Sequence, residues 1–243
     1  MEDILVLSVA TLAAGFLRGV TGFGFALAAV PLYSLSVPPV YAVVMAQMLQ
    51  IAAGPLDIYH NHKKVDRRAL ALLCGGALLF TPLGAFLATR LPADVMRLTI
   101  AIAVLLGLVA LVAKVRIREG KGPAMTAGAM AGLLGGLAAM PGPPAVAYFL
   151  GRGADKTESR ATLLLFFAFT SVIALISIAL GSDAVTFKVF LSAVASYPAL
   201  LLGTYLGTLL FQRLGDGHYR SASMGVLLVS GLMAGAKGLV GLI

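Results

Sequence analysis

The chain has 243 residues, of which 60% are hydrophobic and only 12% are charged. A soluble domain carries about 25% charged residues, so this chain cannot cover a globular surface with solvated side chains. Its formal net charge of +8 comes largely from Lys and Arg in short stretches between apolar runs. Cytoplasmic loops of membrane proteins collect these residues, so the basic balance does not indicate a nucleic-acid partner.

Apolar runs fill most of the length. A membrane-spanning helix needs about 20 apolar residues. In chain order the runs cover roughly 4–36, 40–58, 69–89, 93–113, 123–150, 161–181, 185–211 and 221–243. They leave no room for a separate soluble domain. The sequence therefore predicts an all-α polytopic membrane protein with a single transmembrane domain, residues 1–243.

Two of the runs are unsuited to a straight helix. Run 4–36 would reach about 50 Å as one helix, against a hydrocarbon core of about 30 Å, and Gly22 and Gly24 lie in its middle. Run 123–150 contains Met-Pro-Gly-Pro-Pro at 140–144. Prolines lack the N–H group and clash with the preceding helical turn. Both runs are predicted to be broken, as kinked spans or as re-entrant hairpins.

The two broken runs belong to an internal repeat. GFLRGVTGFGFALAAV (15–30) aligns with GLLGGLAAMPGPPAVA (132–147), and PLGAFLATRL (82–91) aligns with LLGTYLGTLL (201–210) at nearly the same offset. The sequence thus predicts two homologous halves, repeat 1 at about 1–114 and repeat 2 at about 122–243. Each half has a broken segment followed by three transmembrane helices.

The distribution of Lys and Arg favours hairpins. If both broken runs are hairpins, the basic loops 59–68, 114–121, 152–160 and 213–220 all lie on the cytoplasmic side, as the positive-inside rule prefers. A hairpin plus three spans is an odd number of crossings, so the halves would be inverted repeats, a recurrent plan in transporters. Two parallel halves with eight full spans are the alternative.

The breaks are the leading candidates for a binding site. Irregular backbone at membrane depth is tolerated only where it is buried in protein or lines a cavity, and unpaired N–H groups at a helix N-terminus attract anions. Close packing through small residues is the competing interpretation. The candidate residues in the two breaks are Thr21, Gly22, Phe23, Gly24, Pro141, Gly142, Pro143 and Pro144.

Arg18 is the sharpest single candidate, because it immediately precedes the first break within an apolar run. A charge in a span usually faces a cavity or a partner. Arg18 is expected to grip an anion, unless it snorkels to the interface or pairs structurally with a carboxylate such as Asp57. Gln47 and Gln50 share one helix face. Their amides suit binding of anion oxygens or bonding between helices equally well.

Asp57 and Arg160 lie near basic loops. Asp57 is a candidate for proton coupling, although an ion pair with Lys63 or Arg67 at the membrane surface is the commoner arrangement. Arg160 is a candidate for contact with the anion from the cytoplasmic side, and positive-inside anchoring explains it about as well.

Catalytic motifs do not stand out. The chain has no HExxH, no GxSxG and no Walker A sequence, and no pair of acidic residues within one span. His60 and His62 form an HxH pattern without a nearby third ligand, which is a weak metal signal. We therefore expect no enzyme, no metal site and no cofactor.

Three segments together resemble the sulfite exporter TauE/SafE family. They are GFLRGVTGFGFALAAVPL, GLLGGLAAMPGPPAVAYFL followed by RATLLLFFAF, and GTYLG at 203–207. The resemblance covers roughly 8–235 and is closest to the subgroup with Gly-Pro-Pro. Many members carry a glycine cluster where this chain has Met140-Pro141-Gly142.

The resemblance implies a permease of the bacterial cytoplasmic (inner) membrane that carries sulfite, organosulfonates or related organic acids. We expect secondary transport of a small anion by alternating access, with possible proton or sodium coupling and the lipid bilayer as its surroundings. The alternatives are a non-transporting scaffold or anchor subunit for a partner enzyme, or an intramembrane enzyme. The sequence leaves the anion, the direction of transport and the oligomeric state open.

Overall fold

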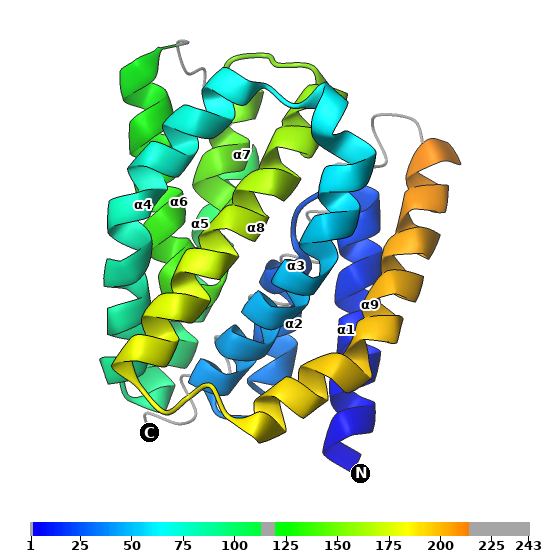
Figure 1. Ribbon diagram of the computed structural model, residues 1–243, viewed down its shortest axis with the longest axis vertical. Helices are drawn as coiled ribbons and strands as arrows, with labels where there is room; N and C mark the ends of the chain where they lie inside the picture. The colour runs from blue at the N-terminus through cyan, green and yellow to red at the C-terminus, as the bar shows by residue number, and fades with distance from the viewer. Residues whose placement is uncertain (1, 113–119, 214–243) are drawn as a thin grey trace.

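The computed structural model describes residues 2–112 and 120–213 (Figure 1). Those residues form helices joined by short connections, which confirms the predicted all-α class. The helices are α1 (Glu2–Thr21), α2 (Phe25–Tyr33), α3 (Pro39–Asn61), the short 3₁₀ helix η1 (His62–Lys64), α4 (Arg67–Arg90), α5 (Ala93–Val112), α6 (Lys121–Ala138), α7 (Gly142–Gly151), α8 (Lys156–Gly181) and α9 (Phe187–Arg213).

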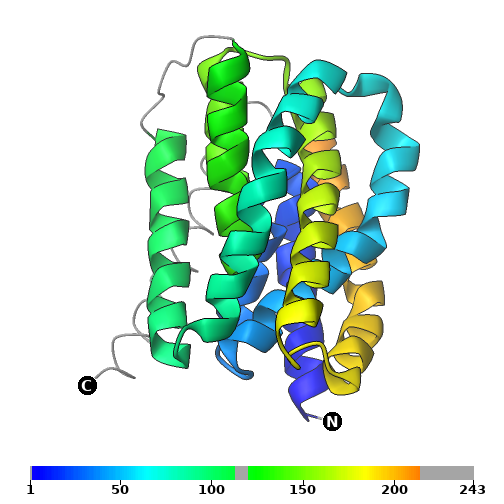
Figure 2. The ribbon, with the colours of Figure 1, turned by 60° about the vertical axis from the view of Figure 1, so that its left-hand side comes forward.

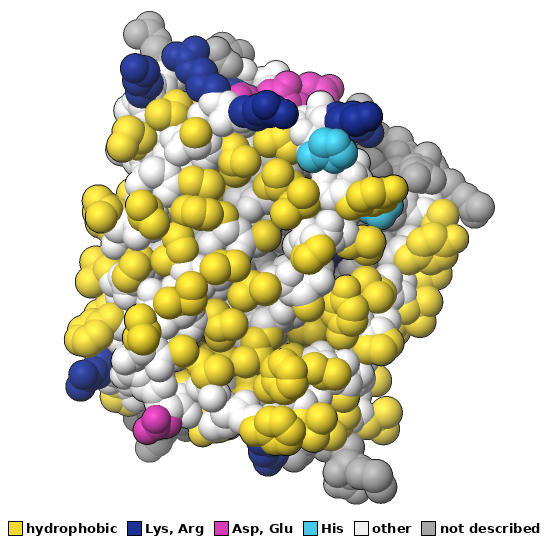
Figure 3. All heavy atoms as spheres, viewed as in Figure 1, with side chains coloured by type: hydrophobic (Ala, Val, Ile, Leu, Met, Phe, Trp, Pro, Cys, Tyr) yellow, Lys and Arg dark blue, Asp and Glu magenta, His cyan; other side chains and the backbone are white. Residues whose placement is uncertain are grey.

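The surface of the helical bundle suits a bilayer. Within the described residues, five helices are long and apolar enough to cross a membrane. Large apolar side chains point outward, among them Leu79, Leu180 and Phe187, which are 75%, 85% and 78% exposed. Hydrophobic side chains cover the middle of the face in Figure 3, and most Lys and Arg side chains gather at one end. The protein is therefore a multi-pass membrane protein.

That end, called the basic end below, holds the loops from α3 to α4 and from α7 to α8 (Figure 1). Local sequence sets the helix starts there. Asp66 caps α4 by accepting a hydrogen bond from the Ala69 N–H (2.9 Å), and Asp155 caps α8 by accepting from the Thr157 N–H (2.9 Å). A carboxylate satisfies backbone N–H groups that have no partner inside the helix. These caps fix where two helices start at the basic end.

Both broken runs are re-entrant hairpins. Figures 1 and 2 show α1 and α2 running in opposite directions, with the start of α1 and the end of α2 at the end opposite the basic one. Helices α6 and α7 form a hairpin that enters from the basic end. This is the predicted arrangement. Neither run crosses the bundle as a full span, as the alternative with eight full spans required. The loop 114–121 lies almost wholly, and the run 221–243 wholly, outside the described residues, so the repeat boundaries stay predictions.

Each hairpin is held by a helix of the other half. The two most extensive helix–helix contacts are α1 with α9 and α4 with α6. Glycines make both contacts possible: a Cβ added at Gly207 on α9 would lie 2.1 Å from the carbonyl oxygen of Phe16, and one at Gly84 on α4 would lie 2.1 Å from that of Leu133. Backbones approach this closely only where side chains are absent. The matching contacts are those expected of inverted halves.

A cavity between the two helix breaks

The first break depends on glycines with positive φ. The N–H of Gly22 donates to the carbonyl of Arg18 (2.7 Å) and completes the last turn of α1. Gly22 and Gly24 have φ of 74° and 94°, values that side chains other than glycine rarely adopt. Thr21 is buried, and its hydroxyl donates to the carbonyl of Leu17 (2.8 Å). Thr21 therefore stabilises the break.

The break leaves the N-terminus of α2 facing inward. Ala28 donates to the carbonyl of Gly24 (3.1 Å), the first bond of the helical ladder. The N–H groups of Phe25, Ala26 and Leu27 precede it and lack acceptors within the helix. These N–H groups and the helix dipole place partial positive charge at this point.

The second break is built differently. Helix α6 ends at Ala138, and the next residue, Ala139, has a φ of 59°, the positive value usually taken by glycine. Its N–H donates to the carbonyl of Gly135 (2.9 Å), and the Met140 N–H donates to that of Leu134 (3.2 Å). The bond from Ala139 to Gly135 is the single bond that defines the αL C-cap motif. Helix α7 then starts with Gly142-Pro143-Pro144, and the prolines carry no N–H. The second break thus offers fewer donors than the sequence interpretation assumed.

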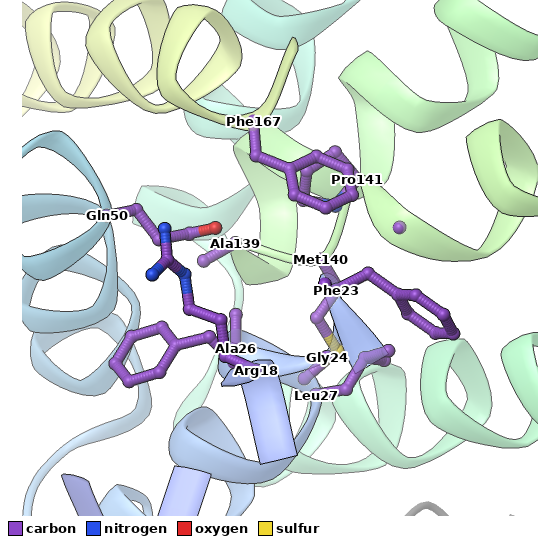
Figure 4. A pocket seen from close by; sticks show the side chains of 13 residues that line it. Arg18, Phe23, Gly24, Ala26, Leu27, Gln50, Ala139, Met140, Pro141 and Phe167 are labelled. Carbon is purple, nitrogen blue, oxygen red and sulfur yellow. The ribbon is translucent and has the colours of Figure 1, made fainter. Parts of the chain in front are cut away.

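Residues from both breaks line one small cavity (Figure 4). The predicted residues that line it are Arg18, Gly22, Phe23, Gly24, Gln50, Pro141 and Gly142. It is also lined by Phe25, Ala26, Leu27, Ala139, Met140 and Phe167, which sequence reasoning missed. The sequence could have indicated Phe25, Ala26 and Leu27, because they form the first helical turn after Gly24. Any ligand at a helix N-terminus contacts that turn. Thr21, Gln47, Asp57, Pro143, Pro144 and Arg160 do not line the cavity.

Arg18 reaches both the cavity and a carboxylate. It is 7% exposed, and its guanidinium forms an ion pair with Asp57 on α3. The interpretation that Asp57 pairs with Lys63 or Arg67 is therefore wrong, because the end of α3 places Asp57 against α1. The pairing with Asp57 that the sequence offered as an alternative is present, and Arg18 also lines the cavity; anion binding by Arg18 stays a prediction.

The two glutamines have different roles. Gln50 is 7% exposed and lines the cavity, and its side-chain nitrogen has no hydrogen-bond partner among the described residues. Buried amide donors are normally satisfied, so this one is available to a ligand. Gln47 instead donates to the carbonyl of Gly135 at the end of α6 (2.7 Å). Gln47 therefore joins the two halves.

Arg160 lies behind the first break. Its guanidinium donates to the carbonyl of Gly19 (3.1 Å), and its aliphatic stem packs against Gly22. A cation at the C-terminus of α1 is favourable because unpaired carbonyls and the helix dipole carry negative partial charge there. Each hairpin is thus capped from the other half, by Arg160 on α8 and by Gln47 on α3. Direct contact of Arg160 with the anion stays a prediction.

A second polar cluster lies at the basic end. Asp66 accepts a hydrogen bond from the Arg152 guanidinium (2.7 Å), and its backbone N–H donates to the Thr162 hydroxyl (3.0 Å). Arg152 also lies over the ring of Phe149, 4.8 Å from its centre. Burial alone would raise the pKa of Asp66, but the hydrogen bonds from Ala69 and Arg152 hold it below its usual value. The cluster ties the α3–α4 loop to the α7–α8 loop.

The histidines of the HxH pattern contact their own helix. The imidazole nitrogen of His60 lies 2.8 Å from the carbonyl oxygen of Leu56, and that of His62 lies 3.1 Å from that of Ile58. Within the described ranges no cluster of three His, Cys, Asp or Glu side chains is placed to hold a metal ion.

Comparison with known proteins places the chain in a family. The family model described as sulfite exporter TauE/SafE matches residues 7–234, which is nearly the whole chain. No curated protein and no solved structure matches the chain significantly. With its membrane-spanning helices, the chain belongs to the sulfite exporter TauE/SafE family, whose members are membrane transporters of sulfite-type anions.

Proposed function

We propose that the protein is a secondary transporter, rather than an enzyme, that carries sulfite, an organosulfonate or a related organic acid by alternating access. Its place is the bacterial cytoplasmic membrane, with the basic end in the cytoplasm. The anion binds in the cavity between the two breaks.

The observation that carries this proposal is the set of donors on the cavity wall. Arg18 supplies a permanent positive charge. The first turn of α2 supplies N–H groups, and the Gln50 amide supplies a donor with no partner among the described residues. In Figure 4, Arg18 and Gln50 lie to one side of the cavity. Anionic oxygens form short, charge-assisted hydrogen bonds with such groups.

The remaining wall is apolar. Phe23, Met140, Pro141 and Phe167 line it, and Phe167 and Pro141 lie across the view from Arg18 in Figure 4. These side chains donate no hydrogen bonds to the oxygens of the anion, and they suit contact with its short carbon chain. A sulfonate or small carboxylate fits a wall with one polar and one apolar side.

The packing of the hairpins supports alternating access. The first hairpin enters from the end opposite the basic one and packs on α9, and the second enters from the basic end and packs on α4. Rocking of one half against the other about the cavity would expose it to each side in turn.

Flux into proteoliposomes tests the proposal. The purified protein should transport at least one member of a panel of sulfite, alkylsulfonates and short carboxylates. Arg18→Ala should abolish flux and Arg18→Lys should retain part of it, because an ammonium keeps the charge but loses the planar fork. Arg97→Ala is the matched control, since Arg97 also pairs with an aspartate (Asp94, 2.6 Å) but does not line the cavity. Full flux in folded Arg18→Ala, or no flux of any anion in the wild type, contradicts the proposal.

A further inference from the structure

Arg18 contacts a carboxylate, that of Asp57, and also the cavity in which we propose that the anion binds. Its guanidinium pairs with Asp57, whereas its side chain also lines the cavity, which Asp57 does not. The side chains of Arg18 and Asp57 are only 9% and 13% exposed. An anion that enters the cavity therefore meets a guanidinium whose charge a carboxylate already neutralises.

Other groups near Asp57 do not remove this competition. Among the described residues, the charges of Arg160 on α8 and of His60 on α3 also act on Asp57, besides that of Arg18 on α1. The Arg160 guanidinium is bound to the carbonyl of Gly19, and Arg160 does not line the cavity. Two negative charges on one shielded guanidinium repel each other, so one of them has to be lost or moved.

We propose that Asp57 is the internal anion that the transported anion displaces from Arg18, and that Asp57 binds one proton when this happens. The inference rests on the proposed function. A sulfonate is a strong acid and keeps its charge, so the carboxylate is the group that is neutralised. The carboxylate gains a proton and becomes a carboxylic acid, Arg18 stays protonated, and no covalent bond to the substrate forms.

The position of Asp57 gives that proton a route. Asp57 lies near the end of α3, which finishes at Asn61 at the basic end. The residues that follow it at the basic end, His60, His62 and Lys63, are polar and exposed. A proton from the basic end can reach Asp57 without crossing the cavity, while the anion sits on the cavity side of Arg18. Proton and anion thus bind together, which links transport to the proton gradient.

Calorimetry on the full chain in lipid nanodiscs tests the link. Methanesulfonate is titrated at several pH values in pairs of buffers with different heats of protonation, so that protons bound per anion are measured directly. Wild-type protein should take up close to one proton per anion. Its Kd should increase about tenfold per pH unit over the pH range in which Asp57 is ionised without the anion and protonated with it, because one proton is then taken up per anion bound. An infrared carbonyl band of a protonated carboxylic acid should appear when the anion is added.

Asp57→Asn should bind methanesulfonate without proton uptake, without the new infrared band and with a pH-independent Kd. His60→Gln and Asp94→Asn should keep the proton uptake. The first removes another ionisable side chain near Asp57, and the second removes a paired carboxylate that is remote from the cavity.

Wild-type binding without proton uptake or without the infrared band overturns this inference and leaves the proposed function standing. Folded Asp57→Asn that binds no anion at any pH also overturns it, because Asp57 then only holds Arg18 in place. If wild-type protein binds no anion of the flux panel at any pH, the proposed function itself fails.

Discussion

The two breaks have the same position in their halves and opposite chemistry. The first places a glycine before α2 and leaves the N–H groups of Phe25, Ala26 and Leu27 beside Arg18. The second starts α7 with Gly142-Pro143-Pro144, which removes two of the N–H groups that a helix N-terminus normally offers. In the proposed site the two breaks contribute differently: the first supplies the polar groups of the cavity wall and the second supplies apolar ones.

The hairpins also differ in the polar contacts that stabilise them. The first is tied internally, since the hydroxyls of Thr11 on α1 and Tyr33 on α2 lie 2.6 Å apart. The second is tied outward, because Arg152 just after α7 pairs with Asp66 of the other half. Arg160 on α8 also bonds to the first hairpin, at the carbonyl of Gly19. Both hairpins therefore contact the other half, the first through a neutral carbonyl and the second through an ion pair.

The largest expected effect tests what the hairpins share. Gly76→Ala should lower the free energy of unfolding by about 3 kcal/mol or more, because overpacking against fixed backbone is costly and the new Cβ would lie 2.1 Å from the Met125 carbonyl oxygen. Gly207→Ala should cost about as much at the first hairpin. Gly75→Ala is the control, since a Cβ there meets nothing within 4 Å. Thermal unfolding in detergent measures all three, and a tolerant Gly76→Ala would contradict the close contact.

The next effect tests the difference in donors. Phe25→Pro removes one N–H from the first turn of α2, a position where proline is common because that N–H has no partner within the helix. Anion affinity should fall about 10- to 100-fold relative to Phe25→Ala, the loss expected for one hydrogen bond to a charged group. Pro143→Ala should change affinity by less than about twofold, since the second break supplies no essential donor in this scheme. Calorimetry with methanesulfonate measures both affinities. Equal losses of affinity in Phe25→Pro and Pro143→Ala would contradict the proposed difference in donors between the breaks.

A smaller effect tests the outward tie. Asp66→Asn keeps a good helix cap but removes the ion pair with Arg152, so it should cost about 1 kcal/mol or less at neutral pH. The lowered pKa of Asp66 means that its charge contributes fully above the ordinary value of 3.8, and that this contribution is lost as the pH falls through the lowered folded value. Unfolding temperatures from pH 5 down to 2.5 should therefore fall more for wild type than for Asp66→Asn. If the unfolding temperatures of wild type and Asp66→Asn fall in parallel with pH, the ion pair between Asp66 and Arg152 does not stabilise the fold.

The smallest effect tests the backbone at the breaks. Ala139→Gly should change stability by less than about 1 kcal/mol, because relief of the left-handed backbone offsets the loss of a buried methyl group. Gly22→Ala should cost clearly more, since its φ is 74° and the new Cβ would lie 2.3 Å from Cγ of Arg160. Denaturant or thermal unfolding of both variants checks the ordering, and the reverse order would contradict the described turn geometries.

Much of the fold was accessible from the sequence because membrane helices obey local rules. Apolar length marked the helices, glycine and proline marked the breaks, and basic loops favoured hairpins over full crossings. The candidate site was predictable only in part. Arg18 and Gln50, which line the cavity, stood out because polar groups are rare in such runs. The sequence could not distinguish Gln50 from Gln47, since both lie on one helix face and only their neighbours differ.

The sequence by itself determined that this chain is a broken-helix membrane protein with a charge next to its first break. Composition, helix length and backbone propensity act within short stretches, so they can be evaluated residue by residue. The tertiary structure alone decided that Arg18 pairs with Asp57 and that Arg160 and Gln47 cap the hairpins of opposite halves. Those contacts join residues far apart in the chain, and only the packing of α3 and α8 against both hairpins brings them together.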